Sequence, residues 1–373
     1  MIYQVMEALD VGDAVSDITR RNATLLAEFG EPSTILTRHI RPPIAHETRP
    51  CEVALETPDC ALIFHYWGYN TSTWLLQAVR GRKAVHYHNI TPPEYFERGS
   101  PLQREMTDGY RQLAEIADDF DLVIGDSRYN VREFARHTSG LQPRLHLHPV
   151  VEPDEITAAP YDTALLTAVR QSARVNFVFV GRLARNKRQD VLIHLFDYYF
   201  RSVDQDARLW LVGNDRFDPS YTAQLGRLRT ALPSRDRIVL TGKVSDPELH
   251  AYLRAADVFV CASEHEGFCV PIAQAMALGV PVVAYAAAAV PETMGGAGVL
   301  VHDWDTRRVG ELVHLVLTDL ELRQTVVAAQ RAALGRFSRD EARARLAAIV
   351  AYLRTGESSP LFERDGRPAS VTA

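Results

Sequence analysis

The stretch SEHEGFCVPIAQAMALGVPVVAY, residues 263–285, determines the fold class and the kind of site expected of this chain. An apolar run at 258–262 precedes it and is typical of a buried strand. An acidic turn with Gly267 follows, and Pro271 then opens a short apolar helix that Gly279 ends, because proline suits the first turn of a helix and glycine its left-handed cap. A second apolar run comes directly after, so the stretch predicts a strand, a helix and a strand of an α/β protein.

The turn of this unit carries Glu266. A strand, turn and helix of this kind direct free N–H groups and the positive end of a helix dipole at one point, which suits a phosphate. A carboxylate at that point does not bind phosphate, and its natural partners are the hydroxyl groups of a neighbouring sugar. We therefore expect a sugar phosphate or a nucleotide sugar as the ligand.

Length and composition indicate a soluble globular protein of two domains: 373 residues, 46% hydrophobic and 24% charged. A net charge of −6 argues against a nucleic-acid-binding surface. The first half is acidic, so membrane contact is expected to be at most peripheral. No apolar stretch approaches the roughly 20 residues of a membrane span, and the first residues read as a strand rather than a signal peptide, so we expect a cytoplasmic protein.

The cysteines and the first loop argue against metal and dinucleotide chemistry. The four cysteines form no CxxC pair and have no metal-ligand spacing, so reduced structural thiols and no metal site are expected for Cys51, Cys60, Cys261 and Cys269. The turn after the first strand lacks a glycine-rich dinucleotide fingerprint, which disfavours NAD chemistry.

Short apolar runs alternate with amphipathic segments along the chain, the pattern of parallel sheets covered by helices. Strands are expected at 2–9, 33–40, 61–67, 83–88, 121–126, 144–150, 175–181, 208–213, 237–241, 257–262, 280–285 and 298–301. In the first half, helices are expected at 14–29, 70–79, 101–118 and 128–138, and further helices at 320–354 end the fold.

This pattern predicts an α/β fold of two doubly wound, Rossmann-like domains that face each other across a cleft. The Pro-, Ala- and acid-rich seam at 150–167 is interpreted as the linker. We expect an acceptor-binding domain at 1–158, rejoined by a C-terminal helix at about 338–356, and a donor-binding domain at 159–337. The tail at 357–373 has the composition of a disordered segment.

Four segments at successive strand ends of the second half form a set: VGRLARNK at 180–187, VGND at 212–215, TGKVSD at 241–246 and the Glu266 loop. Arg182 and Lys187 lie across one turn and can converge on one anion, as a diphosphate leaving group requires. A pair of solvated surface cations is the alternative for these two alone. Asn214 can line the cleft, and the main chain at Lys243 and Val244 can contact a base edge.

These segments resemble the retaining family-4 glycosyltransferases (group 1) of the GT-B fold, and the resemblance covers the second half in order. It implies that Arg182 and Lys187 bind the donor diphosphate and that Glu266 binds the donor sugar hydroxyls. It also implies that the backbone after Glu266 holds the phosphates. The resulting donor-binding residues are Gly12, Gly181, Asn214, Lys243, Val244, Gly267, Phe268, Cys269, Val270 and Gln274.

One position departs from the family pattern. The family motif E-x7-E ends in a glutamate that holds the ribose hydroxyls. In this chain the first glutamate is Glu266, and the position of the second is occupied by Gln274. An amide still accepts a hydrogen bond but lacks the strength of a carboxylate. We predict altered nucleotide binding, with catalysis retained.

The first half is expected to hold the acceptor. His88 ends a strand and matches the family's active-site histidine, whereas His86 is interpreted as structural. Asp13, His65, Asn89 and Thr91 are the further acceptor-binding candidates, Asp13 because its turn with Gly12 matches the family's first loop. Asp126 and Ser127 are left open between a helix N-cap and an acceptor contact.

The predicted function is the transfer of a sugar from a UDP- or GDP-linked donor to an acceptor hydroxyl in glycan, glycolipid or glycosylated-metabolite synthesis. No pair of acids typical of retaining glycosidases is present, so front-face substitution is expected, with Arg182, Lys187, Glu266 and His88 as catalytic residues and no cofactor or metal. Two alternatives stay open: a sugar-nucleotide epimerase of the same architecture and a non-catalytic nucleotide-sugar binder. The sequence predicts no oligomeric state.

Overall fold

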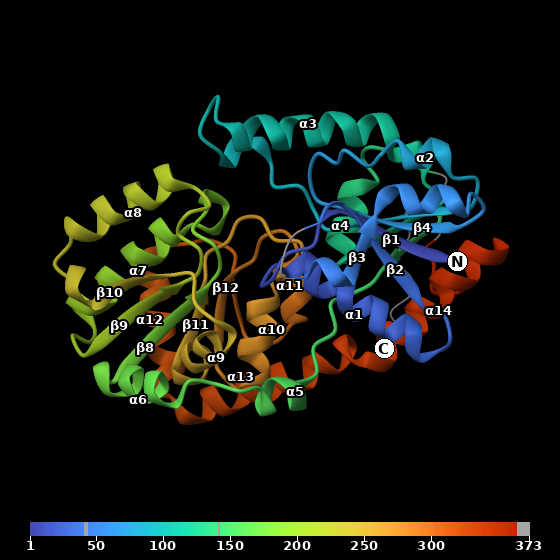
Figure 1. The fold of residues 1–373 in the computed structure, drawn as a ribbon. Helices are drawn as coiled ribbons and strands as arrows, with labels where there is room; N and C mark the ends of the chain where they lie inside the picture. Colours follow the sequence, from blue (N-terminus) through green and yellow to red (C-terminus); the bar gives the residue numbers. More distant parts are fainter. Residues whose placement is uncertain (41–43, 141, 364–373) are drawn as a thin grey trace. The chain divides into compact units, whose positions relative to one another are not determined.

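The computed structural model describes residues 1–40, 44–140 and 142–363 (Figure 1). The chain divides into two compact units, unit 1 with Met1–Val150 and Phe337–Ala373, and unit 2 with Val151–Arg336. Each unit has one parallel sheet with helices on both faces. The predicted fold class, two doubly wound Rossmann-like units, is confirmed.

The described part of unit 1 contains a seven-stranded sheet in the order β3-β2-β1-β4-β5-β6-β7. Its strands are β1 (Ile2–Ala8), β2 (Ser33–His39), β3 (Thr48–Pro50), β4 (Ala61–Tyr66), β5 (Lys83–Tyr87), β6 (Leu122–Gly125) and β7 (Arg144–His146). Its helices are α1 (Ala14–Glu28), α2 (Leu75–Ala78), α3 (Pro101–Ile116), α4 (Arg128–Phe134) and α14 (Arg339–Thr355). The strand order reverses between β1 and β4, so their carboxyl ends mark the place where such sheets bind ligands.

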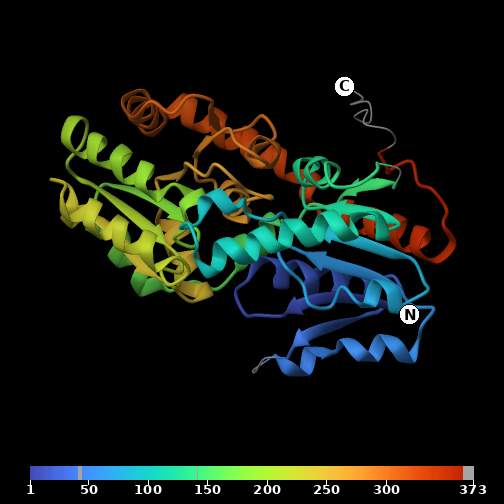
Figure 2. The same ribbon diagram turned by 90° about the horizontal axis from the view of Figure 1, so that it is seen from above.

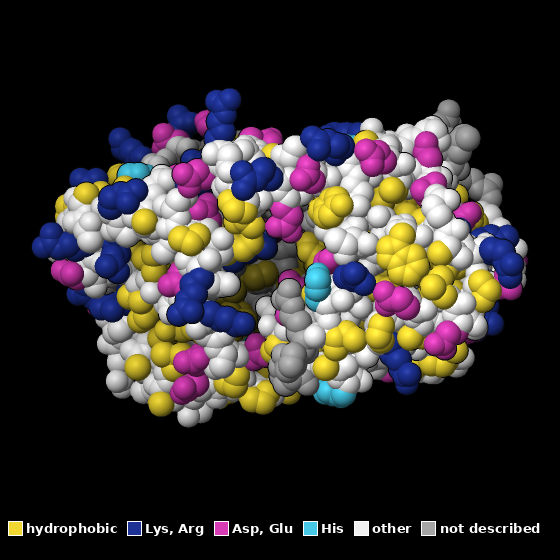
Figure 3. Space-filling model, turned by 45° about the horizontal axis from the view of Figure 1, so that its top comes forward, with side chains coloured by type: hydrophobic (Ala, Val, Ile, Leu, Met, Phe, Trp, Pro, Cys, Tyr) yellow, Lys and Arg dark blue, Asp and Glu magenta, His cyan; other side chains and the backbone are white. Residues whose placement is uncertain are grey.

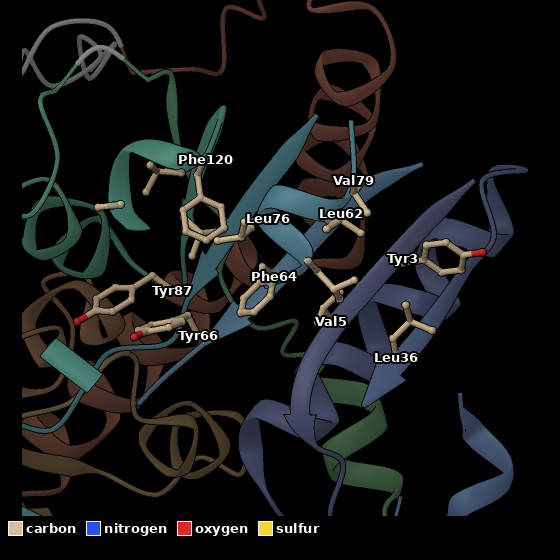
Figure 4. Packing of buried hydrophobic residues seen from close by; sticks show 14 of the residues in the cluster. Tyr3, Val5, Leu36, Leu62, Phe64, Tyr66, Leu76, Val79, Tyr87 and Phe120 are labelled. Atoms are coloured by element: carbon tan, nitrogen blue, oxygen red, sulfur yellow. The ribbon is translucent and has the colours of Figure 1, made fainter. Parts of the chain in front are cut away.

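Alternation along the strands of unit 1 builds two apolar layers. Every second residue points to one face, where Val5, Phe64 and Tyr87 pack with residues of α2 and α3 (Figure 4). The residues between them point to the other face, where Ile63 and Leu122 pack against α1 and α14. Figure 1 shows α3 above and α14 below this sheet, and α3 lies in front of its strands in Figure 2.

Helix α14 returns to unit 1 after the whole of unit 2 and completes the second layer with Leu346, Ile349 and Leu353. The segment after it also packs on unit 1. Residues 357–363 belong to the tail whose composition predicts disorder, but Phe362 is buried in this layer and the Glu363 backbone bonds with Arg144 of β7. The remainder of that predicted tail, 364–373, lies outside the described residues.

Unit 2 has a six-stranded sheet in the order β10-β9-β8-β11-β12-β13. Its strands are β8 (Val175–Val180), β9 (Ala207–Val212), β10 (Ile238–Gly242), β11 (Val258–Cys261), β12 (Val282–Tyr285) and β13 (Val299–Val301). Its helices are α5 (Pro153–Ala158), α6 (Thr163–Ser172), α7 (Gln189–Ser202), α8 (Pro219–Thr230), α9 (Asp246–Ala255), α10 (Val270–Ala277), α11 (Val290–Met294), α12 (Thr306–Thr318) and α13 (Leu320–Ala333). Here the order reverses between β8 and β11.

Short 3-10 helices complete the two units. They are η1 (Ala45–Glu47), η2 (Cys51–Glu56), η3 (Pro93–Tyr95), η4 (Ala117–Asp119), η5 (Arg185–Lys187), η6 (Arg235–Arg237) and η7 (Leu334–Phe337).

Three local features differ from the sequence expectation. The seam predicted as a linker forms α5 and the start of α6, because Pro153 suits a first helical turn and Arg254 Nη2 binds the carbonyls of Ile156 and Thr157. Strand β3 was not predicted. The helix expected at 70–79 is reduced to α2, Leu75–Ala78.

Charged side chains of both signs are interspersed over the surface that Figure 3 shows. The four cysteines are free thiols and are buried. Within 1–40, 44–140 and 142–363, no helix has both the length and the apolar character that a membrane crossing requires.

Candidate functional site

The reversal point of the unit 2 sheet brings Lys187 and Glu266 into contact. Lys187 lies in η5 after β8, and Glu266 lies in the turn after β11. Asn186 joins the two loops: its Nδ2 donates to the His265 carbonyl at 3.0 Å, and its own carbonyl accepts from Glu264 N at 2.9 Å. Lys187 Nζ consequently lies 2.6 Å from Glu266 Oε2, with the side chains 15% and 7% exposed.

Arg182 lies at the end of the same strand as Lys187 but makes a different contact. Its guanidinium carbon lies 4.0 Å from the centre of the Phe217 ring, and its carbonyl accepts from Gln189 Nε2 at 2.9 Å. A cation over an aromatic face is held by the ring quadrupole. Phe217 was not predicted, because it lies in the β9–α8 loop outside every recognised segment.

Close packing of glycines fixes the neighbouring strand ends. A β-carbon on Gly213, whose φ is +147°, would lie 2.2 Å from the Gly181 carbonyl oxygen, so only glycine lets these loops approach each other. The Gly213 N–H donates to the Gly242 carbonyl at 3.2 Å. The ends of β8, β9 and β10 are therefore held together as one edge.

The other donor-binding candidates of this edge lie at its surface. Asn214 is exposed and its Oδ1 accepts from the Arg216 N–H at 2.9 Å, while its carbonyl accepts from Leu183 N. Lys243 is exposed and Val244 is half-buried. These residues lie on the strand ends predicted for them.

The turn after Glu266 is fixed at several points. The Glu266 carbonyl accepts from Ala289 N at 3.2 Å, and Thr293 Oγ1 donates to the Phe268 carbonyl. Cys269 has φ 74° and serves as the N-cap of α10, whose first residue is Val270. Gln274 lies half-buried in the same helix, one turn further on. Burial lowers the pKa of the adjacent His265 to about 4, opposed by the Glu266 carboxylate.

In unit 1, four polar side chains form a chain of hydrogen bonds behind the carboxyl ends of β4 and β5. His88 Nδ1 lies 2.9 Å from Asp126 Oδ2, and His88 Nε2 lies 2.8 Å from His65 Nδ1. His65 Nε2 in turn lies 3.0 Å from Gln4 Oε1. His65, His86, His88 and Asp126 are all buried.

The hydrogen-bond acceptors at the two ends of this hydrogen-bonded series determine which ring nitrogens carry a proton. Asp126 and Gln4 Oε1 accept hydrogen bonds, so His88 Nδ1 and His65 Nε2 each carry a proton. Burial, reinforced by the charges of the neighbouring histidines, holds the pKa of His65 well below its usual range.

His86 and Asp126 complete the group. Burial lowers the pKa of His86 to about 4, and its Nε2 lies 3.0 Å from Asp126 Oδ1 while its Nδ1 has no hydrogen-bond partner among the described residues. Burial alone raises the pKa of Asp126, but the His88 charge and the hydrogen bonds from both rings outweigh it and hold that pKa below its usual range. Of the two roles left open for Asp126 and Ser127, Ser127 provides the N-cap of α4, while the Asp126 carboxylate is bonded to the rings of His86 and His88.

The loop after β5 presents an amide that lacks partners. Asn89 has φ 77° and is 8% exposed, and neither Nδ2 nor Oδ1 has a hydrogen-bond partner within the described parts of the chain. Thr91 lies half-buried nearby in the sequence. Tyr110 fixes the loop, since its hydroxyl lies 2.8 Å from the Ile90 carbonyl and 2.8 Å from Glu133 Oε1.

Glu133 was not predicted as part of this region. It lies in α4 and is buried, and burial raises its pKa while hydrogen bonds from Tyr110 and Tyr87 oppose that rise. In the sequence, Glu133 is simply a glutamate within a predicted helix. A solvent-exposed glutamate would look the same, so the sequence does not identify this residue as part of the site. The first loop of unit 1 is exposed: Gly12 has φ +73°, and Asp13 Oδ2 caps α1 by accepting from Ser16 N at 3.0 Å.

Among the described residues, two groups of side chains have the composition of a cation site: His65, His86 and His88, and Cys261, Glu266 and Cys269. In the first, the planes of the His65 and His88 rings are parallel to within 4°, with 2.8 Å between the facing nitrogens. A separation of about 3.3 Å or more is needed to place a cation between two nitrogens at ~2.1 Å each. In this geometry the facing nitrogens of His65 and His88 are hydrogen-bonded to each other.

The family described as glycosyl transferases group 1 matches residues 174–319, which lie within unit 2. A curated relative, the D-inositol 3-phosphate glycosyltransferase of Xylanimonas cellulosilytica, is 28% identical over 240 residues, or 62% of this chain and 57% of the relative. The chain thus spans little more than half the length of that relative.

Two solved structures are similar over both units. Sucrose-phosphate synthase from Thermosynechococcus elongatus has a TM-score of 0.75 at 20% identity, with 95% of this chain and 99% of that chain covered. Anabaena HepE in complex with UDP-glucose has a TM-score of 0.70 at 19% identity, with 94% and 99% covered. These likenesses establish the fold, which is of the GT-B type.

Proposed function

We propose that this protein, whose second unit matches the group 1 glycosyltransferases and whose two units have the GT-B fold, is a retaining glycosyltransferase. It transfers a sugar from a UDP- or GDP-linked donor to an acceptor hydroxyl. The observation that carries the proposal is the Lys187–Glu266 ion pair at 2.6 Å, which lies where the strand order of unit 2 reverses.

The pair supplies the two functions that a nucleotide-sugar donor requires. An ammonium has three N–H donors, so Lys187 can keep its bond to Glu266 and still bind a phosphate oxygen. The carboxylate of Glu266 has two oxygens, and the one not bound to Lys187 can accept from sugar hydroxyls. Arg182, held against Phe217, supplies a second positive charge for the diphosphate.

The reaction then proceeds by front-face substitution. The acceptor oxygen forms its bond to the anomeric carbon while the bond from that carbon to the phosphate oxygen breaks. The acceptor proton passes to the departing phosphate, and the growing negative charge is stabilised by Arg182 and Lys187. Glu266 orients the sugar ring and favours its developing positive charge.

Unit 1 is proposed to hold the acceptor. The polar groups available there are the Asn89 amide, Thr91 and the exposed loop with Asp13. Both ring nitrogens of His88 are bonded, to Asp126 and His65, so His88 is proposed to shape the site without moving a proton. His65 positions His88.

The test is a thermal-shift screen with UDP-, GDP-, ADP- and TDP-sugars, followed by transfer assays with the donor that stabilises the protein. Lys187→Met should remove the donor-dependent shift and lower turnover by roughly 100-fold or more, since it removes a charge from the leaving-group site. Lys83→Met, a lysine of β5 in the other unit, is the matched control and should leave both unchanged.

Incubation of the donor without an acceptor separates the proposal from the epimerase alternative. A new sugar epimer in that mixture would identify an epimerase. Donor binding with neither transfer nor hydrolysis across all acceptor classes would identify a non-catalytic binder. Full transfer activity in the Lys187→Met variant would refute the role given to the ion pair.

A further inference from the structure

Two thiols and one carboxylate form a compact group in unit 2. Cys261 ends β11, Cys269 caps α10, and Glu266 lies in the turn between them. One ligand atom from each residue, two Sγ atoms and a carboxylate oxygen, lies within 4.8 Å of the other two, and all three residues are buried. In a tetrahedral site with Zn–S bonds of ~2.3 Å the sulfur atoms are about 3.8 Å apart, a separation that lies within the 4.8 Å limit found here.

The conformation of Cys269 is a second sign that this group is specific. Its φ of 74° and ψ of 67° are left-handed, which is unfavourable by roughly 1–2 kcal/mol for a residue with a β-carbon. Glycine would take this conformation without strain. The chain nevertheless has a cysteine there, and its Sγ lies within 4.8 Å of the Sγ of Cys261.

The charges around the group favour a divalent cation. Once a bound cation has displaced the two thiol protons, the two thiolates and the Glu266 carboxylate carry three negative charges, and the Lys187 ammonium, 2.6 Å from Glu266, carries one positive charge. A divalent cation makes this set neutral. Thiolate ligands select soft cations over Mg²⁺ or Ca²⁺, and Ser263 Oγ, 3.3 Å from Cys261 Sγ, adds a neutral polar group beside the thiols.

We propose that Cys261, Cys269 and Glu266 form a binding site for a soft divalent cation such as Zn²⁺ or Cd²⁺, and that the bound cation prevents Glu266 from binding the donor sugar. Binding releases the two thiol protons to solvent and involves no change of oxidation state. The second part rests on the proposed function, because it takes Glu266 as the sugar-binding carboxylate. The site is thus inhibitory.

The cysteines are too far apart in the sequence for a spacing argument to find this site. Seven residues separate Cys261 from Cys269, and the usual short spacings of zinc ligands are absent. The fold brings them together because β11 ends where α10 begins its return across the sheet.

The experiment uses the full chain, reduced and freed of metal, and titrates it with Cd²⁺ while the ultraviolet absorption of cadmium-bound thiolate is recorded. We expect one cadmium per chain and release of two protons. Cys261→Ala and Cys269→Gly should each abolish the absorption; the glycine suits the positive φ, so a melting curve should show an intact fold. Cys51→Ala and Cys60→Ala, which remove buried thiols of unit 1, are the matched controls and should retain it.

The absence of cadmium absorption in the natural protein, or its persistence in Cys269→Gly, would overturn the site. A second measurement repeats the donor thermal shift with and without Cd²⁺, and the shift should disappear in its presence. An unchanged shift would overturn the inhibition. If no nucleotide sugar stabilises the protein at all, the proposed function fails while the cadmium titration still decides whether the site exists.

Discussion

Asn89 combines two features that are unfavourable in a stable protein. Its backbone lies in the left-handed region with φ 77°, and its amide is buried without a hydrogen-bond partner among the described residues. The buried, unpartnered amide costs about 1–3 kcal/mol, whereas asparagine adopts the left-handed region more readily than other residues with a β-carbon. Under the proposed function, the hydroxyls of a bound sugar are suitable partners for this amide.

We predict that Asn89→Gly leaves the melting temperature unchanged or raises it, and lowers transfer activity roughly 10-fold or more. Glycine accepts the positive φ and removes the unsatisfied amide, whereas the ligand loses one or two hydrogen bonds. Ala288→Gly is the control, because Ala288 also has a positive φ, of 51°, but carries no polar side chain. A strongly destabilised Asn89→Gly protein would show that the amide serves the fold instead.

At the scale of single residues, the sequence locates strand-end groups but not their partners. Lys187 and Glu266 follow apolar runs, so their neighbouring positions could be predicted, and the structure has their side chains in contact. The pairing of His88 with Asp126 could not be predicted from the sequence, because it depends on β5 lying beside β6 and on both side chains lying on the same face of the sheet. The orphan amide of Asn89 and the thiol pair likewise depend on backbone angles that no local pattern specifies.

Strands β4 and β5 carry histidines that are buried in the neutral form. The pKa of His86 is lowered to about 4 and that of His65 lies well below its usual value, in both cases chiefly by burial. The unfolded chain binds a proton at each ring near pH 6.5, while the folded protein does not. Their folded pKa values are depressed, so the stability of unit 1 falls as the pH is lowered from about 6.5 toward 4.

We predict that His86→Gln reduces this acid destabilisation, by up to about 1.4 kcal/mol per pH unit in that window. The measurement is the free energy of unfolding in urea at a series of pH values between neutral and about 5. His302→Gln, which replaces an exposed histidine, should leave the pH dependence unchanged. Parallel curves for His86→Gln and the natural protein would contradict the prediction.

Helix α3 is joined to the loop after β5 through Tyr110, whose hydroxyl lies 2.8 Å from both the Ile90 carbonyl and Glu133 Oε1. We predict that Tyr110→Phe destabilises unit 1 by about 1–3 kcal/mol, because the Ile90 carbonyl and Glu133, which share its single hydroxyl hydrogen, lose their buried partner. It should also raise the KM for the acceptor more than that for the donor, since Asn89 adjoins this loop. Tyr69→Phe, at a residue 47% exposed, is the control and should change neither quantity.

At the scale of elements, apolar periodicity was sufficient to predict the buried strands and insufficient to predict the edge strand β3. The runs that became β1, β4 and β8 are rich in branched and aromatic residues, so both faces of a parallel strand could be predicted from them. β3 was missed because it has three residues and ends in Pro50, which gives no periodic signal.

Unit 1 is discontinuous in the sequence, and its second apolar layer depends on α14. Leu346, Ile349, Val350 and Leu353 are buried in that layer, and burial of such side chains stabilises by about 1.5–3 kcal/mol each. Their sum is comparable with the whole stability of a typical domain, about 5–15 kcal/mol. Unit 2 is continuous, Val151–Arg336.

We predict that a chain ending at residue 336 retains a folded unit 2 but not a folded unit 1, because the layer of Ile63 and Leu122 is then exposed. Protease digestion with mass spectrometry should recover a resistant fragment close to 151–336 and rapid cleavage within 1–150. Equal protection of both segments would show that α14 is dispensable. A chain ending at residue 356, which keeps α14, is the matched control.

The return of α14 also has a consequence for biosynthesis. A ribosome releases the chain from its amino end, so the strands of unit 1 emerge first but lack the helix that covers one side of their sheet until residues 339–355 appear. Unit 2 is complete in sequence earlier and can fold first. The nascent protein thus carries an amino-terminal half whose sheet stays uncovered on one side through most of its synthesis.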